Sequence, residues 1–186
     1  MRLVLASASP RRRELLHAAG FECDVDPANV DETRRPHETA RDFVARLALE
    51  KAHAVAARHP TRPVLAEDTE VVVGEEVLGK PADADHAGQM LRRLSGRAHE
   101  VITGLALVVD GQAFSAVEQT AVWMSELSAS EIAWYVGSSE PMDKAGAYAI
   151  QGLASRFIPR IEGSYSNVVG LPVATLLQLL HRAGVF

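Results

Sequence analysis

Hydrophobic and polar positions along the chain switch between a helix-like and a strand-like period from one end to the other. The first apolar run begins at Leu3 and suits a short buried strand, and apolar residues then recur at helical spacing up to Gly20. Ser9 stands where an N-cap is expected, and Pro10 suits the first helical position because its missing N–H costs nothing there. The chain is therefore predicted to begin with a strand, a tight turn and a helix.

The same periodicities predict the remaining elements. In the first half these are an extended segment at 21–30, a helix opened by Pro36 and Thr39 and ending near His59, a strand at 64–73, a hairpin turn at 74–76, and a helix from Asp83 to Gly96. In the second half they are strands at 101–109 and 113–124, a helix from Ser128 to about Val136, and a loop that leads into a small-residue strand within 140–152. A strand at 157–161, a polar turn at 163–167 and a helix from Pro172 to Ala183 follow.

This alternation predicts an α/β or α+β fold built on one long mixed central sheet flanked by helices. The chain has 186 residues, of which 47% are hydrophobic, so it is long enough for a real core. No linker, repeat or low-complexity segment divides it, and we expect a single domain over residues 1–186.

Charge and cysteine content exclude several classes of protein. The net charge of −5 argues against nucleic-acid binding through bulk charge. The single cysteine, Cys23, excludes an intrachain disulfide and a cysteine-based zinc cluster. The sequence contains no signal peptide and no apolar run long enough to span a membrane, so we expect a cytoplasmic protein without membrane contact.

Three arginines, Arg11, Arg12 and Arg13, lie in the first turn of the first predicted helix. Free backbone N–H groups and the helix dipole favour an anion at this end, and guanidinium groups add bidentate contacts to phosphate. Cations oppose the dipole here, so a helix without an anionic ligand would avoid them. The alternative is a solvated arginine face.

Carboxylates interrupt the valine-rich strand at 64–73. Alternation places Asp68 and Glu70 on one face of this strand and Glu67 and Thr69 on the other. Carboxylates in an apolar strand are costly unless they are paired, bound to a metal or solvated at an edge. We expect a cluster that contains Asp68, with Asp31-Glu32 also available for a divalent cation.

Two lysines add positive charge to this picture. Lys51 lies inside the apolar stripe of the second predicted helix, where its ammonium either reaches solvent along the stem or points into a cleft. Lys80 belongs to a segment, 74–81, that matches the pattern of a phosphate-binding loop. We reject that loop because Pro81 replaces the required hydroxyl residue, and a hairpin that brings Lys80 close to Asp68 fits better.

Six segments, in matching order and spread over essentially the whole chain, resemble the Maf family. They are Leu5–Arg12, Asp68-Thr69, Gly79–Pro81, Ser95–His99, Glu140–Tyr148 and Asn167–Pro172. The resemblance implies a cytoplasmic nucleoside triphosphate pyrophosphatase that cuts between the α- and β-phosphates and releases a nucleoside monophosphate. It also implies a fold like that of the inosine triphosphate pyrophosphatases, with two lobes and a cleft, and a divalent metal cation, Mg²⁺ or Mn²⁺.

The resemblance further implies roles for single residues. Those implied to bind the triphosphate are Ser7, Arg11, Arg12, Lys51 and Lys80. Glu32 and Asp68 are implied as metal-binding carboxylates, with Asp68 also the catalytic base. The specificity positions are Arg11, Thr69 and Gln151, and Gln151 resembles the branch that acts on dTTP and UTP.

The sequence departs from the family pattern beside the base. Glu67 stands where a small residue is usual, and Glu70 stands where an apolar residue is usual. Extra charge there would raise the pKa of the base or recruit a second metal ion.

Hydrolysis of dTTP and UTP is thus the expected function, with a nucleoside triphosphate as the partner. Three alternatives stay open at this point: a 7-methyl-GTP pyrophosphatase of the sister branch, a non-catalytic nucleotide-binding regulator of cell division, and a nucleic-acid-binding module. The last is disfavoured by the net charge and by the lack of interleaved aromatic residues. A homodimer is an assembly that the resemblance allows.

Overall fold

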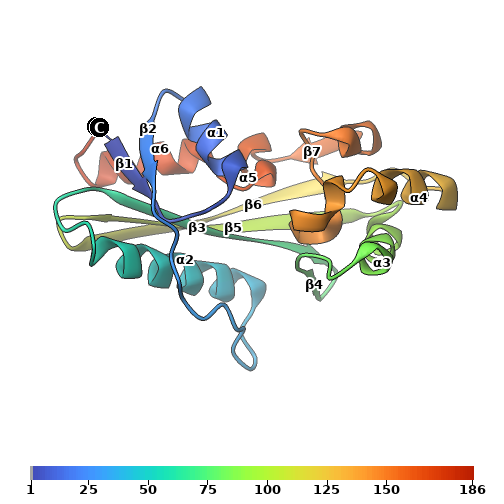
Figure 1. Ribbon diagram of the computed structural model, residues 1–186, viewed down its shortest axis with the longest axis horizontal. Coiled ribbons are helices and arrows are strands. Elements are labelled where there is room, and N and C mark those ends of the chain that lie inside the picture. The colour runs from blue at the N-terminus through green and yellow to red at the C-terminus, as the bar shows by residue number, and fades with distance from the viewer. Residues whose placement is uncertain (1) are drawn as a thin grey trace. The chain divides into compact units, whose positions relative to one another are not determined.

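The structure is a computed structural model in which residues 2–186 are described (Figure 1). Its elements up to the middle of the chain are β1 (Arg2–Leu5), α1 (Pro10–Ala18), β2 (Glu22–Val25), α2 (Ala40–Ala56), β3 (Val64–Val73), β4 (Glu76–Leu78), α3 (Ala84–Leu94) and β5 (Ala98–Val109). Those that follow are β6 (Gln112–Trp123), α4 (Ala129–Gly137), the 3₁₀ helices η1 (Glu140–Asp143), η2 (Ala145–Ala147) and η3 (Leu153–Phe157), β7 (Arg160–Glu162), α5 (Tyr165–Val169) and α6 (Val173–Arg182).

Within the described residues the strands form one mixed sheet in the order β2-β1-β3-β5-β6-β7, with β4 paired to β3. Strand β1 runs parallel to β2 and to β3, whereas β4 is antiparallel to β3 and β7 is antiparallel to β6. The mixed central sheet that the alternating periods predicted is confirmed.

Contacts divide the chain into two compact units. Unit 1 consists of the residues up to Thr69 together with Thr103–Glu118 and Gly170–Phe186, and unit 2 consists of Glu70–Ile102 and Gln119–Val169. The long strands β3, β5 and β6 contribute residues to both units, so the boundary falls within strands and not in a linker.

In unit 1 the side chains of β1, β3 and β5 alternate between two apolar clusters, one on each face of the sheet. Leu3 and Leu5 of β1 pack with Leu16 of α1 and with α6, whereas Val4 of β1 packs with Ala52 of α2. Figure 1 accordingly shows α2 on one face of these strands and α1 and α6 on the other. A period of two in the strand therefore decides which helix each strand residue meets.

Three helices begin where their capping residues predict. Thr39 accepts a hydrogen bond from the Asp42 amide at the start of α2, and Asp83 does the same for the His86 amide at the start of α3. Ser128 and Glu131 form the reciprocal capping box of α4. Each cap satisfies backbone N–H groups that have no partner inside the helix.

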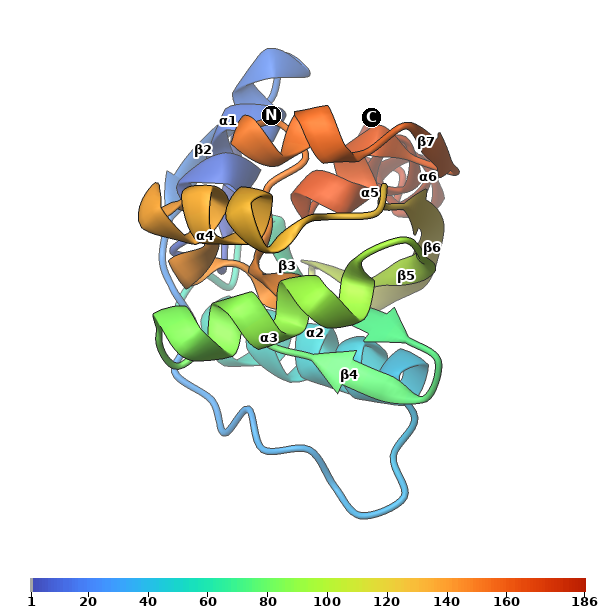
Figure 2. The same cartoon turned by 90° about the vertical axis from the view of Figure 1, so that its right-hand side faces the viewer.

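Unit 2 packs α3 and α4 against each other and against its strands, and Figure 2 shows these two helices side by side. Their shared apolar cluster includes Leu91, Leu94 and Ile132, with the fully buried Tyr135 and nearby Phe157 in edge-to-face contact at 6.0 Å between ring centroids. This cluster is the core of the unit.

Three predictions for the last third of the chain differ from the structure. Residues 145–157 form η2, a turn and η3 instead of a small-residue strand, because Gly146 and Ala147 have φ of +69° and +57°, outside the extended region. The predicted polar turn at 163–167 overlaps α5, and the strand predicted at 157–161 is the short β7, which begins at Arg160.

No helix within residues 2–186 is long and apolar enough to cross a membrane.

A histidine and a tyrosine form a buried polar pair in unit 2. His99 is 2% exposed and Tyr148 is 6% exposed, with His99 Nε2 at 2.8 Å from the Tyr148 hydroxyl. His99 Nδ1 has no hydrogen-bond partner in the described part of the chain. Burial lowers the pKa of His99 from 6.5 to about 4, so this side chain is neutral in the folded protein at pH 7.

This pair predicts a loss of stability in acid. The unfolded chain binds a proton at His99 near pH 6.5, whereas the folded protein binds it only near pH 4, so acidification through this window favours unfolding. We expect His99 to lower the free energy of unfolding by about 3 kcal/mol across that window. Urea unfolding at a series of pH values measures this effect. His99→Gln, which does not titrate, should show a shallower decline, and an equal decline in both proteins would contradict the assignment.

Candidate active site

The candidate site begins where β1 ends beside β3. Leu5, the last residue of β1, pairs with Leu65, so β3 continues past the end of its parallel neighbour with Glu67, Asp68 and Thr69. Ligands of open α/β sheets bind outside the carboxyl ends of parallel strands. The predicted carboxylates therefore lie at the position where such a fold places its ligand.

Arg12 connects the loop after β1 to β3 and to the segment before α6. Its Nε donates to the Gly170 carbonyl oxygen at 2.9 Å, and Nη1 donates to Ser7 Oγ at 3.1 Å and to the Glu67 carbonyl oxygen at 3.3 Å. Nη2 donates to Thr69 Oγ1 at 3.1 Å. The side chain is 14% exposed, so the alternative of a solvated arginine face is wrong for this residue.

Glu67 is a carboxylate without solvent exposure, and Arg12 is its counter-ion. Arg12 Nε lies 3.2 Å from Glu67 Oε1, while neither carboxylate oxygen has a hydrogen bond of good geometry among the described residues. Burial raises the pKa of Glu67, and the positive charges of Arg12 and Lys51 oppose that rise. The charge that interrupts this strand is thus paired, not solvated at an edge.

Lys51 brings together the two carboxylates predicted to bind metal. Its Nζ lies 2.8 Å from Asp68 Oδ1 and 2.9 Å from Glu32 Oε1, and the residue is 7% exposed. The ammonium group therefore does not reach solvent along its stem, and that interpretation of the helical stripe is wrong. Glu32, on the loop before α2, is exposed, so the cluster is open to solvent on this side.

Alternation along β3 explains how these charges are sorted. Glu67 and Thr69 point toward Arg12 of α1, whereas Asp68 points to the opposite face and meets Lys51 of α2. The prediction that Asp68 and Glu67 occupy different faces is confirmed. Adjacent residues of one strand thus hold cations from two different helices.

Few side chains at this site could bind a metal ion. Within residues 2–186, no group of three or more His, Cys, Asp and Glu side chains is arranged to hold a metal ion. Glu32 and Asp68 nevertheless share one cation, Lys51 Nζ, and Mg²⁺ is commonly held by one or two carboxylates together with substrate phosphates. A pair of carboxylates fits that mode of binding.

The other predicted residues are placed as follows. Arg11 lies in the first turn of α1 and is partly buried. Lys80, just after β4, and Gln151, in the turn between η2 and η3, are exposed and belong to unit 2. The structure brings together Ser7, Arg12, Glu32, Lys51, Asp68 and Thr69 within unit 1, and the contribution of Lys80 and Gln151 stays a prediction.

Two residues that hold Arg12 in place were not predicted from the sequence. Gly170 supplies the carbonyl oxygen for Nε and has φ of +119°, a conformation that favours glycine. Thr103 Oγ1, fully buried in β5, lies 2.9 Å from Thr69 Oγ1 and supports that hydroxyl. Gly170 belongs to a segment with family resemblance, but nothing in its local pattern indicates Arg12 as the partner.

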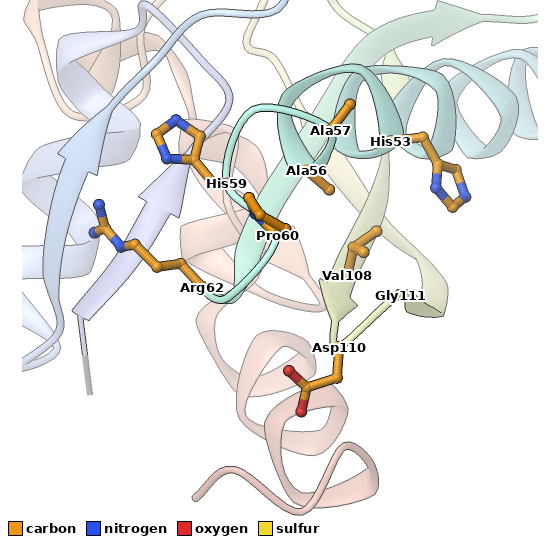
Figure 3. A pocket seen from close by; sticks show the side chains of 9 residues that line it. All are labelled: His53, Ala56, Ala57, His59, Pro60, Arg62, Val108, Asp110 and Gly111. Carbon is orange, nitrogen blue, oxygen red and sulfur yellow. The ribbon is translucent and has the colours of Figure 1, made fainter.

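A separate hollow of about 310 Å³ lies at the carboxyl end of α2 (Figure 3). Figure 3 shows the rings of His53 and His59 pointing apart, so they do not converge on one ligand. His59 Nε2 lies 2.7 Å from Asp26 Oδ2, and Arg62 donates to Asp24 Oδ2 at 2.8 Å. The polar groups of His59 and Arg62 are therefore already paired with carboxylates. None of the predicted site residues lines this hollow.

Comparison with known proteins agrees with the sequence motifs and the fold. The protein is 54% identical over 183 residues to a dTTP/UTP pyrophosphatase of Myxococcus xanthus, covering 98% of this chain and 93% of that protein. It is 49% identical over 185 residues to a dTTP/UTP pyrophosphatase of Koribacter versatilis, covering 100% of this chain and 96% of that protein.

The fold resembles that of the Staphylococcus aureus Ham1 protein, with a TM-score of 0.53, 14% sequence identity, and coverage of 99% of this chain and 100% of that one. A profile described as Maf-like protein matches residues 2–183. The resemblance that the sequence motifs indicated is therefore confirmed, and the chain belongs to the Maf family.

Proposed function

We propose that this protein is a nucleoside triphosphate pyrophosphatase that hydrolyses dTTP and UTP to the nucleoside monophosphate and pyrophosphate. The observation that carries the proposal is the cluster beyond the end of β1, in which Lys51 Nζ lies 2.8 Å from Asp68 and 2.9 Å from Glu32, while Ser7 and Thr69 hold the guanidinium of Arg12 on the other face of β3. Two relatives that are 54% and 49% identical to this chain over nearly its full length are named dTTP/UTP pyrophosphatase.

A triphosphate needs positive charge, and its hydrolysis adds negative charge at the α-phosphorus in the transition state. In this proposal the triphosphate is bound by Ser7, Arg11, Arg12, Lys51 and Lys80. The hydrogen bonds of Arg12 use its Nε–H, both N–H groups of Nη1 and one of Nη2. One N–H of Nη2 is left to bind phosphate. The main role of Arg12 is therefore to fix the positions of the Ser7 and Thr69 hydroxyl groups.

Asp68 is the proposed base. Its side chain is 12% exposed, and its carboxylate accepts a hydrogen bond from Lys51 through Oδ1, which fixes its orientation. We assign its second oxygen to orient the attacking water.

Glu32 and Asp68 are the proposed ligands of Mg²⁺ or Mn²⁺. A bound divalent ion supplies further neutralisation of the triphosphate charge. Glu67, paired with Arg12, is not part of this ligand set.

Base choice is assigned to Gln151, with Arg11 and Thr69 as further specificity positions. A side-chain amide offers one acceptor and two donors, which match the N–H and carbonyl of the pairing edge of uracil and thymine. The Thr69 hydroxyl is engaged by Arg12 and Thr103, so we expect it to act on specificity through Arg12. Both units then belong to one catalytic domain spanning residues 1–186.

Product identity tests the proposed reaction. With Mg²⁺ present, UTP and dTTP should each yield the monophosphate and one pyrophosphate, because the proposed attack is at the α-phosphorus. Chromatography of the nucleotide products, with a pyrophosphate-specific assay, distinguishes the outcomes. Orthophosphate with a diphosphate product would contradict α–β cleavage, binding without turnover would indicate a regulator, and preference for 7-methyl-GTP would indicate the sister activity.

Asp68→Asn should lower kcat by roughly 10², because the amide keeps the shape of the carboxylate but loses its negative charge. Steady-state kinetics with UTP measures the change, and circular dichroism checks that the variant is folded. Asp24→Asn is the matched control, since Asp24 is an ion-paired carboxylate in β2 with no contact to the cluster. Turnover near that of the unmodified protein in a folded Asp68→Asn variant would remove Asp68 from the base role.

Arg12→Ala should cost stability as well as activity. The change removes the counter-ion of the fully buried Glu67 and the guanidinium hydrogen bonds to Ser7 and Thr69, which together should lower the free energy of unfolding by about 3 kcal/mol. Urea unfolding measures this cost, with the exposed Arg13→Ala as control. If both variants unfold at the same urea concentration, Arg12 does not stabilise the site.

A further inference from the structure

The turn that carries Gln151 is well defined within unit 2. The Gly152 amide donates to the Ala149 carbonyl oxygen at 3.0 Å, which closes the turn. Ile150, 7% exposed, anchors the turn in the apolar cluster of the unit. Gln151 is exposed, and its side chain makes no hydrogen bond to any other residue of the range 2–186. The amide of Gln151 is therefore free for a ligand while its backbone is held.

The carboxylate of Glu140 binds the backbone that follows Gln151. The Leu153 amide donates to Oε2 at 3.0 Å, and the Ala154 amide donates to Oε1 at 3.4 Å. The Tyr135 hydroxyl donates to Oε1 at 2.8 Å. Hydrogen bonds to a carboxylate are stronger than those between neutral groups, so this side chain fixes the exit of the turn.

The same tyrosine binds the backbone that precedes Gln151. The Ala149 amide donates to the Tyr135 hydroxyl oxygen at 3.1 Å. Tyr135 is fully buried, and burial together with the hydrogen bond to Glu140 raises the pKa of its phenol. The hydroxyl thus stays protonated, accepts from Ala149 and donates to Glu140, so one pair of side chains holds both ends of the turn.

Gly152 is required by the space that Glu140 fills. A Cβ atom at Gly152 would lie 2.2 Å from Glu140 Oε2 and 2.5 Å from its Cδ. The φ of Gly152, −106°, is open to any residue, so steric exclusion by the carboxylate and not backbone strain explains the glycine. The carboxylate is packed directly beneath the residue next to Gln151.

We propose that Glu140 is a positioning residue that sets base discrimination by holding Gln151 in place. The inference rests on the proposed function, in which the Gln151 amide reads uracil or thymine. Recognition by an amide requires its atoms to be held within a fraction of an ångström. A looser turn would let the amide rotate and accept the edge of cytosine, which presents the opposite arrangement of donor and acceptor.

Kinetics with two nucleotides test this role. Glu140→Gln keeps the size of the side chain but turns an NH₂ group toward N–H and O–H donors. We expect it to lower the ratio of kcat/KM for UTP to that for CTP by about tenfold, with a much smaller change in kcat for UTP. Glu131→Gln is the matched control, because Glu131 also accepts hydrogen bonds from backbone and hydroxyl groups but belongs to the capping box of α4.

A second variant displaces the turn but keeps the negative charge of Glu140. Gly152→Ala forces the turn away from Glu140 and should lower the same ratio. In a Gln151→Ala background, Glu140→Gln should cause no further loss, because a positioning residue acts only through the group that it positions. An equal loss with and without Gln151, or an unchanged ratio in folded Glu140→Gln protein, would overturn the proposal.

Hydrogen exchange on the full chain without nucleotide separates positioning from activity. The amides of Ala149, Leu153 and Ala154 should exchange faster in Glu140→Gln than in the unmodified protein, and not in Glu131→Gln. Unchanged exchange at these amides would overturn the positioning role whatever the kinetics show. Equal kcat/KM for UTP and CTP in the unmodified protein would instead overturn the specificity that we propose for Gln151.

Discussion

Two adjacent carboxylates in β3 are the constraint on which unit 1 depends. Glu67 is fully buried and Asp68 is 8% exposed, and an uncompensated buried charge costs several kcal/mol. Because successive strand residues face opposite sides, each carboxylate needs its own cation from the helix on its side of the sheet. Arg12 of α1 and Lys51 of α2 supply these cations. Hydrogen bonds from Arg12 in turn fix the loop that carries Ser7 and the carbonyl group of Gly170.

This arrangement is costly for a protein that only has to fold, and useful for one that binds a charged substrate. Apolar residues of similar size at these positions would often be as stable or more so. The charges are instead ordered in advance by contacts such as Arg12 Nη2 to Thr69 Oγ1 and Lys51 Nζ to Glu32. Groups that are already oriented need little reorganisation when charge develops on a phosphate, which is the main electrostatic contribution to catalysis.

Unit 2 uses buried polar groups in a different way. The Tyr135–Glu140 pair ties backbone segments together around Gln151, and the His99–Tyr148 pair adds a neutral polar contact to the core. In the proposed function unit 1 contributes the catalytic carboxylate and most of the cations, while Gln151 of unit 2 contributes to the selection of the base. Buried hydrogen-bond networks suit the second task because they specify one conformation of a turn.

Local patterns in the sequence determined the mixed α/β fold, the starts of α2, α3 and α4 at their capping residues, and the opposite orientations of Glu67 and Asp68 on β3. These features depend on neighbours within a few residues, so the sequence by itself carries them. Only the tertiary structure decided that residues 145–157 form 3₁₀ helices, that the Lys51 ammonium ends between two carboxylates, and that Arg12 is bound to Gly170, 158 positions away. Such contacts are set by packing between distant segments, and no local period encodes them.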